Sequence, residues 1–466
     1  MGPEVVLALT KNQHDTLHDH LFPGDGCEAV AIALCGRRNG EKRHKLLVRE
    51  IHPVPYEQCS ERSQLRLTWS TETLVPLIKK AKQKGWSILK VHSHLDNDTS
   101  FSLLDDDADR DLFPSVYGWM DNELPHISVI MRPTGYMFGR VVTSRGDFTP
   151  LSAVNLVGDD LMFWRTGKEQ ILVPEFGTRV AQTFGEGTYD LLRSIKAGVI
   201  GCSGTGSLMV EQLARNGIGK LLLVDPDVVE EKNLNRIPNT TQQDAINRTA
   251  KVRVLSKSIE KMGLGTEVMA LQKNLIDPET VLAVADCDIV FGCLDTVEGR
   301  HVLNRLASFY TIPYIDMGVR LIADGNGNVD EVCGNVHYLK PDGSSLLSRE
   351  LYTEEELRAE SLFRTNPKEY EARRKDGYIK NVNEEKPAVI SVNMTVAALA
   401  MNEFLARIHP FRVKPNADYA IQRFSLAKGF FHNDLDGHPC AALSKHVGRG
   451  DVDPLLDFPS LHIEPK

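Results

Sequence analysis

The stretch AGVIGCSGTGS, residues 197–207, decides the fold of the second part of this 466-residue chain. An apolar run ends in a loop that holds Gly201, Gly204 and Gly206, and a helical pattern follows. Glycines between a buried strand and a helix leave backbone amides and the positive helix end facing any phosphate. Alone, the pattern is a weak indication of nucleotide binding, because a tight turn would also account for it.

The sequence around this stretch predicts two kinds of domain. From Ala197 onward, strand-like runs such as KLLLVD and DIVFGCL alternate with helical segments, which predicts right-handed βαβ units and a parallel sheet. The first third mixes strand-like runs with one clear helix, residues 71–85, capped by Ser70 or Thr71 and ended by Gly85. We therefore expect an α+β domain followed by an α/β Rossmann-like domain.

Composition shifts suggest where these domains meet. We expect a first domain at 1–150, an irregular linker at 151–176 and a second domain at 177–466. Residues 344–386 are highly charged and include helix-forming stretches. They could be a solvated insertion, but so long a connection inside a compact domain is often a lid.

The overall composition excludes several classes. Hydrophobic residues at 42% and charged residues at 25% are typical of soluble proteins rather than disordered or collagen-like chains. The net charge of -9 gives no electrostatic indication that the protein binds nucleic acid. No apolar run approaches the ~18 residues that span a bilayer, and the start MGPEVVLALT lacks the basic region of a secretory signal. We expect a cytoplasmic protein with no membrane partner. Its 8 cysteines include no CxxC pair, so no disulfide framework is predicted.

Metal-ligating residue types gather at the end of the run SILKVHSH. Period-2 alternation points His92 and His94 to the same side of a strand. Ten residues separate His94 from Asp105, and Ser102 stands three before it. Two histidines and one carboxylate leave an open zinc position for water, the catalytic arrangement. Glu28 opens the apolar strand EAVAIALC and is a candidate general base with a raised pKa.

This pattern resembles the JAMM/MPN+ (JAB) metalloproteases over roughly residues 5–145. The resemblance implies that zinc is bound by His92, His94 and Asp105. It implies that Glu28 carries the proton from water to the leaving amine and that the Ser102 hydroxyl helps to hold the oxyanion. Leu95 stands where the family usually has proline, so the loop could differ in shape.

Other interpretations of these residues stay open. HSH could be an exposed strand end beside a solvated acidic loop. Glu50 and Glu57 are also upstream carboxylates, although neither opens an equally apolar strand. A second histidine group near the start could form a separate zinc cluster, but its spacing is more typical of a helix surface: His14, His18 and His20.

The residues after the glycine-rich loop narrow the nucleotide chemistry. Asp225 lies twenty-four residues after Gly201, where a carboxylate can accept hydrogen bonds from ribose. Up to this point an NAD-dependent dehydrogenase fits equally well. The residues that discriminate are Asn233, Arg236, Lys251 and Asp295. Splitting ATP builds charge on the phosphates and needs such groups, whereas hydride transfer does not.

The ordered set resembles the ThiF/MoeB and ubiquitin-activating adenylyltransferases from about Arg179 to Leu405. The resemblance implies that Asp225 holds the ribose and Asp295 binds Mg²⁺. It implies phosphate contacts by Asn233, Arg236 and Lys251. In many relatives an arginine at the position of Arg179 reaches the triphosphate from the partner subunit, so a homodimer is expected. Residues 344–386 would be the family's crossover loop.

One departure from that family concerns thioester chemistry. Relatives commonly carry a catalytic cysteine in or near the crossover loop, but there is none from Gly334 to Pro439. LKPDGSS has serines where relatives often have cysteine. Cys440 is the best remaining candidate, because its polar neighbours could leave the thiol exposed. A structural thiol is the alternative.

Together these patterns predict a bifunctional enzyme that acts on the C-terminal tail of a ubiquitin-like or sulfur-carrier protein ending in glycine. ATP with Mg²⁺ would serve C-terminal adenylation, and Zn²⁺ would serve peptide or isopeptide hydrolysis, in maturation or deconjugation. The sequence leaves open whether a conjugating enzyme takes part. The alternatives are sulfur-carrier activation for cofactor or siderophore biosynthesis, and a binding scaffold without catalysis.

Overall fold

The chain forms two compact units, each described here by itself. The computed structural model describes residues 2–96, 98–167, 172–375 and 387–462. Unit 1 comprises residues 1–169, 309–311 and 446–452, and unit 2 comprises the remainder. Residues 168–171 of the expected linker and 376–386 of the expected crossover loop lie outside the described residues. The domain limits proposed from composition stay a prediction.

Unit 1 is built on a nine-stranded mixed sheet in the order β11-β10-β1-β3-β2-β6-β7-β8-β9. The strands are β1 (Glu4–Thr10), β2 (Val30–Asn39), β3 (Arg43–Pro53), β6 (Ser87–Ser93), β7 (His126–Met131), β8 (Met137–Val142), β9 (Phe148–Pro150), β10 (Ala153–Val157) and β11 (Leu161–Arg165). A separate two-stranded sheet joins β4 (Cys59–Arg62) to β5 (Leu67–Trp69). The strand β6 runs parallel to β7 and antiparallel to β2.

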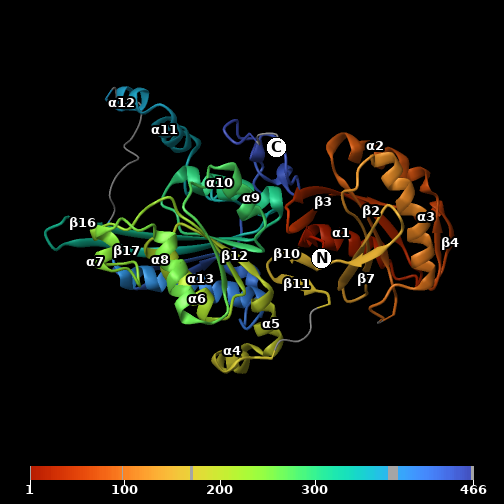
Figure 1. Ribbon diagram of the computed structural model, residues 1–466, viewed down its shortest axis with the longest axis horizontal. Coiled ribbons are helices and arrows are strands. Elements are labelled where there is room, and N and C mark those ends of the chain that lie inside the picture. The colour runs from red at the N-terminus through yellow and green to blue at the C-terminus, as the bar shows by residue number, and fades with distance from the viewer. Residues whose placement is uncertain (1, 97, 168–171, 376–386, 463–466) are drawn as a thin grey trace. The chain divides into compact units, whose positions relative to one another are not determined.

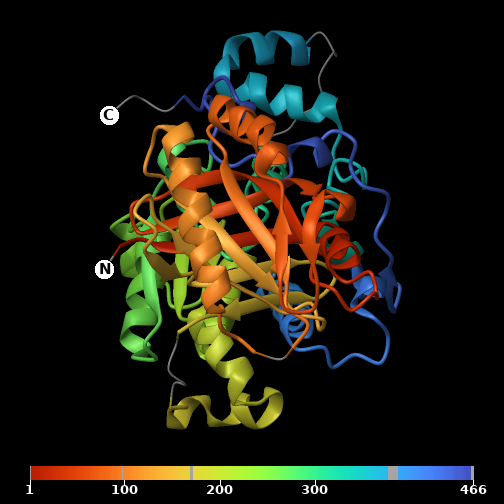
Figure 2. The same cartoon turned by 90° about the vertical axis from the view of Figure 1, so that its right-hand side faces the viewer.

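Three helices cover the two faces of this sheet. They are α1 (Lys11–Leu21), α2 (Leu74–Lys84) and α3 (Leu103–Met120). Alternate residues of β2 enter different cores: Ala31 packs in the cluster that includes Leu17 of α1, whereas Ile32 packs in the cluster that includes Ile78 of α2 and Val116 of α3. Figures 1 and 2 show α2 and α3 along the same side of the sheet. Packing on both faces of β2 therefore buries every residue of the strand except Asn39.

The predicted helix at 71–85 is confirmed, except that the α-helix begins at Leu74 rather than at Thr71. A short 3-10 turn, Thr71–Thr73, leads into α2, and the Ser70 side chain accepts a hydrogen bond from the Glu72 amide. Gly85 ends the helix at φ 67°, a left-handed conformation that glycine adopts without strain. The sequence did not indicate α3, because its first two turns carry few apolar residues and resemble a solvated acidic loop.

Unit 2 contains an eight-stranded sheet in the order β14-β13-β12-β15-β16-β17-β18-β19. The strands are β12 (Lys196–Ile200), β13 (Lys220–Val224), β14 (Glu267–Leu271), β15 (Ile289–Gly292), β16 (Tyr314–Ala323), β17 (Val329–Leu339), β18 (Ile421–Ser425) and β19 (Phe430–Asp434). The pairs from β14 to β16 are parallel and those from β16 to β19 are antiparallel. The predicted α/β domain is confirmed, and its sheet is parallel from β14 to β16, whereas the antiparallel part from β16 to β19 was not predicted.

Helices connect and cover these strands. They are α4 (Thr178–Phe184), α5 (Glu186–Ser194), α6 (Gly204–Arg215), α7 (Gln242–Ile246), α8 (Lys251–Met262), α9 (Pro278–Ala285), α10 (Val297–Tyr310), α11 (Glu354–Thr365), α12 (Pro367–Lys375) and α13 (Ile390–Ile408). The strand order reverses between β12 and β15, where open α/β sheets bind ligands beyond the carboxyl ends of their strands. None of the helices in the described residues is both long and apolar enough to cross a membrane.

Candidate functional site

The predicted metal ligands converge on one point in unit 1. His92 lies on β6, His94 follows that strand directly, and Asp105 lies in the first turn of α3. The Nε2 atoms of His92 and His94 are 2.9 and 3.2 Å from the two carboxylate oxygens of Asp105, and 3.3 Å from each other. Among the described residues, these three are the one group of potential ligands whose donor atoms all lie within 4.8 Å of one another.

Burial and charge act in opposite directions in this cluster. Burial lowers the pKa of His92, and the hydrogen bond to Asp105 opposes this only in part. Burial would raise the pKa of Asp105, but the hydrogen bonds to His92 and His94 overcome it and hold that pKa well below its usual range. A neutral imidazole and an ionised carboxylate are the forms that bind a metal.

Local hydrogen bonds explain why the strand end has this shape. Ser93, between the two histidines, points to the opposite face of β6, and its Oγ accepts a hydrogen bond of 2.8 Å from the Ala29 amide. The Ser93 amide donates to the Ala29 carbonyl at 3.0 Å, and the His94 amide donates to Met131 at 3.1 Å. These bonds tie the histidine pair to the start of β2, beside Glu28. Sequence reasoning did not assign any role to Ser93.

Glu28 and Ser102 lie at the edge of the cluster. Burial raises the pKa of the Glu28 carboxyl to about 7, with His94 opposing the shift and the charge of Asp105 adding to it. Ser102 is the N-cap of α3, and its Oγ donates to Asp105 at 2.7 Å. Both side chains are therefore close to the metal ligands, and their predicted catalytic roles stay predictions.

The side chains present fit a zinc ion. Two imidazole nitrogens and a carboxylate are zinc donors, and they face one another where the remaining coordination position would be open. The Nδ1 atom of His92 is buried without a hydrogen-bond partner in the described part of the chain, so packing and Asp105 orient that ring.

The competing candidates are engaged elsewhere. Glu50 pairs with Lys80 at 2.7 Å. The Nε2 atoms of the other histidine group each lie within hydrogen-bonding distance of a different backbone carbonyl, those of Gly135, Pro133 and Val30 for His14, His18 and His20. These three histidines therefore bind the backbone, as expected of a helix surface rather than of a zinc cluster.

The glycine-rich loop of unit 2 lies between β12 and α6. Gly201 has φ 90°, and a β-carbon there would lie 2.6 Å from the Cys293 carbonyl oxygen. A β-carbon at Gly206 would overlap the Gly201 carbonyl oxygen. Glycine is thus required at both positions by the close approach of the loop to itself and to the segment after β15.

Asp225 and Lys251 meet at the ends of neighbouring elements. Asp225 follows β13 and accepts a hydrogen bond from the Cys202 amide in the glycine-rich loop at 2.6 Å. Lys251 begins α8, and its Nζ lies 3.9 Å from Asp225 and 2.7 Å from Asp227. Burial raises the pKa of Asp225 while Lys251 opposes the shift. The structure therefore brings together three of the predicted elements: the loop, the acid and the lysine.

The remaining predicted residues differ from one another in burial and in their contacts. Arg236 is half-buried, and its Cδ would lie 3.3 Å from a β-carbon on Gly204. Asn233 is buried, and its Oδ1 accepts from the Glu230 amide at 3.0 Å. Asp295 is exposed just after β15, and Arg179 is exposed on α4, where it donates to Gln182 at 3.2 Å. No hydrogen bond or ion pair joins Arg179 to the glycine-rich loop in the described residues.

Sequence reasoning missed two side chains that lie near predicted nucleotide-binding residues. Asn393 of α13 is 4% exposed, and its amide lies where a β-carbon on Gly204 would be. Glu360 of α11 accepts a hydrogen bond of 2.7 Å from the Glu298 amide at the start of α10, close enough to Asp295 for that charge to raise the Glu360 pKa, although burial is the largest cause. Neither residue belongs to a recognisable motif, so only the fold reveals them.

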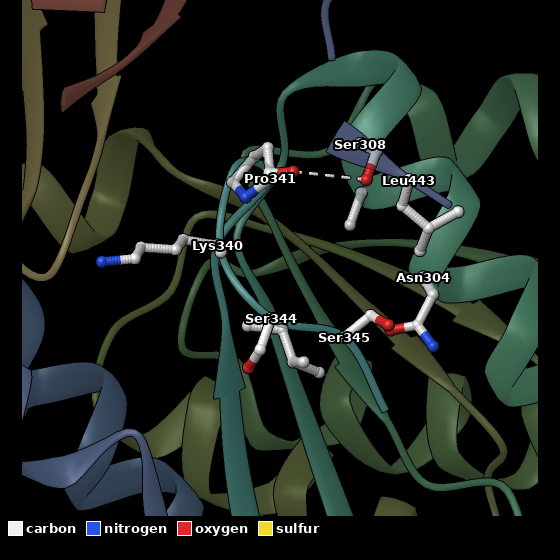
Figure 3. A pocket seen from close by; sticks show the side chains of 10 residues that line it. Asn304, Ser308, Lys340, Pro341, Ser344, Ser345 and Leu443 are labelled. Carbon is white, nitrogen blue, oxygen red and sulfur yellow. Dashed lines mark hydrogen bonds between the residues drawn. The ribbon is translucent and has the colours of Figure 1, made fainter. Parts of the chain in front are cut away.

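Of the two interpretations of Cys440, burial favours the structural thiol over an exposed, catalytic one. The residue is 3% exposed, and its amide donates to Gly343 at 3.0 Å. Its neighbour Leu443 lines a pocket with room for little more than one water molecule, together with Ser344 and Ser345, which Figure 3 shows. Polar neighbours in the sequence did not keep the thiol in solvent, because the backbone here folds onto the segment after β17.

Comparison with known proteins identifies unit 2. A model of the ThiF family matches residues 176–429, which is more than half of the chain. The chain belongs to the ThiF family. This confirms the predicted ThiF-type resemblance, and the resemblance of unit 1 to the JAMM/MPN family stays a prediction.

Individual relatives are more distant. Ubiquitin-like modifier-activating enzyme 5 of Aedes aegypti is 25% identical over 165 residues, covering 33% of this chain and 39% of that protein. The Drosophila melanogaster protein of the same name is also 25% identical, over 33% and 38%. The chain thus covers about two fifths of these relatives. A crystal structure of E. coli MccB with ATP is 18% identical, with a TM-score of 0.42 over 57% of this chain and 73% of that one.

Proposed function

We propose that this protein is a bifunctional enzyme that adenylates the C-terminal carboxylate of a ubiquitin-like or sulfur-carrier protein and hydrolyses peptide or isopeptide bonds at that same tail. The observation that carries the proposal is the convergence of His92, His94 and Asp105 in a chain that also belongs to the ThiF family. A zinc hydrolase and a carboxylate-activating enzyme can both recognise one extended protein terminus, which would explain their fusion.

In the adenylation reaction, a tail carboxylate oxygen attacks the α-phosphorus of ATP and pyrophosphate leaves. Backbone amides at the start of α6 would face the phosphates, and Lys251 and Arg236 would offset the charge that develops there. Asp225 would accept hydrogen bonds from the ribose hydroxyls, and Asp295 would hold Mg²⁺, which would offset phosphate charge when bound. Arg179 is exposed and is available to the active site of a second copy in a homodimer.

In the hydrolytic reaction, His92, His94 and Asp105 would hold zinc. The ion, when bound, acidifies water and polarises the scissile carbonyl. Glu28 would accept the water proton and deliver it to the departing amine as the C–N bond breaks. The Ser102 hydroxyl, which donates to Asp105 in this structure, would turn its proton to the carbonyl oxygen as charge develops there.

The step that follows adenylation favours a second candidate function, sulfur-carrier activation. Of the cysteines of unit 2 that follow the glycine-rich loop, Cys287 and Cys440 are buried, and burial is the largest cause that raises the pKa of the half-buried Cys293 and Cys333. A thioester on these cysteines of unit 2 is therefore disfavoured. An external amine or sulfur donor would consume the adenylate, and a sulfur donor corresponds to sulfur-carrier activation.

The test uses the purified full chain and a candidate carrier ending in Gly-Gly. We expect zinc near one equivalent per chain, carrier-dependent exchange of pyrophosphate into ATP, and cleavage of a carrier fused through its C-terminus to a second protein. Exchange without zinc or cleavage would remove the hydrolase. Loss of both activities would leave a binding scaffold. Formation of a carrier thiocarboxylate, rather than an isopeptide, would identify the sulfur pathway.

A further inference from the structure

A buried network of charges lies on α3 one turn beyond the metal ligand Asp105. Asp109 is fully buried, and its Oδ1 lies 2.6 Å from the Lys90 ammonium and accepts from the Ser128 hydroxyl at 3.1 Å. Its Oδ2 accepts two hydrogen bonds from Arg140, at 3.0 and 2.7 Å. One carboxylate therefore joins α3 to three strands, β6, β7 and β8.

The arginine of this network is itself firmly held. The Arg140 guanidinium lies 3.8 Å from the ring centre of Phe101 and 3.7 Å from that of Phe148, and it also pairs with Asp106. Phe101 belongs to the loop that leads from His94 to Ser102. The network thus contacts both the first turns of α3 and the loop before them.

The first half of α3 has no other buried anchor. From Leu103 to Arg110, Asp109 is the only buried residue, and Leu103 and Leu104 are 83% and 56% exposed. The apolar anchors all lie in the second half of the helix: Phe113, Val116, Tyr117 and Met120. Hydrophobic packing therefore does not fix the turn that carries Asp105.

The network links β6 to α3 a second time, about one helical turn away from the metal ligands. Lys90 precedes His92 by two strand residues, about 6.6 Å along β6. Asp109 follows Asp105 by four helix residues, about 6 Å along α3. The pair Lys90–Asp109 therefore spans β6 and α3 as the pair His92–Asp105 does.

We propose that Asp109, with Lys90 and Arg140, is a positioning residue for the metal site: it sets the position of α3 along β6 so that the Asp105 carboxylate reaches both imidazoles. The proposal rests on the zinc site proposed above. A buried carboxylate with four short, directional bonds permits one helix position, whereas an apolar contact tolerates sliding by part of a turn.

The test measures zinc affinity of the full chain by competition with a chromophoric chelator, and the visible absorption spectrum of the Co²⁺-substituted protein. We expect Asp109→Asn to weaken zinc binding about 10- to 100-fold, the usual effect of losing a group that orients a metal ligand, and to change the Co²⁺ bands. Asp107→Asn is the matched control, because it removes the same charge from the exposed side of α3. It should change affinity less than about twofold.

Ser128→Ala gives a milder test, because it removes one uncharged donor and keeps both ion pairs of Asp109. We expect zinc binding about two- to fivefold weaker, in proportion to one lost hydrogen bond. If Asp109→Asn does not fold, the Ser128 variant decides. Wild-type zinc affinity and Co²⁺ spectrum in a folded Asp109→Asn or in Ser128→Ala would overturn the positioning role. A wild-type chain that binds no zinc would overturn the metal site itself.

Discussion

The two candidate sites are assembled in different ways. In unit 1 the ligating atoms come from one strand end and one helix start within 14 residues of sequence, and they already contact one another. In unit 2 the groups follow separate strands or begin a helix, and Asp295 remains exposed while Asp225 and Lys251 pair. A site built from neighbouring residues can be complete before its ligand binds, whereas the predicted nucleotide-binding groups of unit 2 come from several elements and are only partly in contact with one another.

The largest expected effect tests whether the sites are independent. His94→Ala removes one of three zinc ligands, so we expect loss of bound zinc and a fall of about a thousandfold or more in peptide hydrolysis. Pyrophosphate exchange should stay within about twofold. Metal analysis by mass spectrometry and both activity assays give the result. His18→Ala, a histidine of α1, is the control; loss of both activities in His94→Ala would contradict independent sites.

Asp295→Ala tests the exposed member of the nucleotide site. Because the side chain is exposed, we expect the free energy of unfolding to change by less than about 0.5 kcal/mol. Exchange should fall about 100-fold if the carboxylate holds Mg²⁺, with zinc content and hydrolysis retained. Asp330→Ala removes an exposed carboxylate from β17 and should leave exchange unchanged. Retained exchange in Asp295→Ala would refute the magnesium assignment.

Gly206→Ala tests the close approach within the glycine-rich loop. The added methyl group would overlap the Gly201 carbonyl, so the loop must shift, and we expect about 10- to 100-fold weaker ATP binding and a free energy of unfolding about 1–3 kcal/mol lower. Calorimetric titration with ATP and denaturant unfolding measure both. Gly187→Ala on α5, where a β-carbon meets nothing within 4 Å, should be neutral or slightly stabilising. Equal effects of the two substitutions would refute the steric argument.

The smallest expected effect is a change in the free energy of unfolding with pH. The histidine responsible lies in unit 1, so the two units can be compared. Burial holds the pKa of His126 in unit 1 well below its usual value, and its Nδ1 accepts from the Ile88 amide at 2.9 Å. The folded form therefore stays neutral while the unfolded form takes up a proton below about pH 6.5, so stability decreases as pH falls. Between pH 7.5 and 5.0 this histidine should lower the free energy of unfolding by about 2 kcal/mol.

The check is denaturant unfolding at both pH values. His126→Asn keeps an acceptor near Nδ1 but does not titrate, so it should reduce the pH dependence of the unit 1 transition and leave that of unit 2, which contains the buried His337, unchanged. An undiminished pH dependence in the variant would show that other groups control the acid sensitivity.

Much of both sites could be predicted because their chemistry is encoded in spacing along the chain. Period-2 alternation placed His92 and His94 on one side of β6, and the glycines after β12 indicated the turn into α6. Asp109, Ser93 and Asn393 could not be predicted in the same way. Their partners come from other elements, and an isolated acid, hydroxyl or amide in a sequence is indistinguishable from a solvated side chain.

The sequence by itself determined the residue types, the alternation of strands and helices, and the ThiF family to which residues 176–429 belong. The tertiary structure alone decided that a helix, α3, follows the loop after His94, that Cys440 is buried, and that Asp109 joins α3 to three strands. The physical reason is that local propensity and periodicity act over a few residues, whereas burial and ion pairing depend on which distant backbone segments the fold brings together.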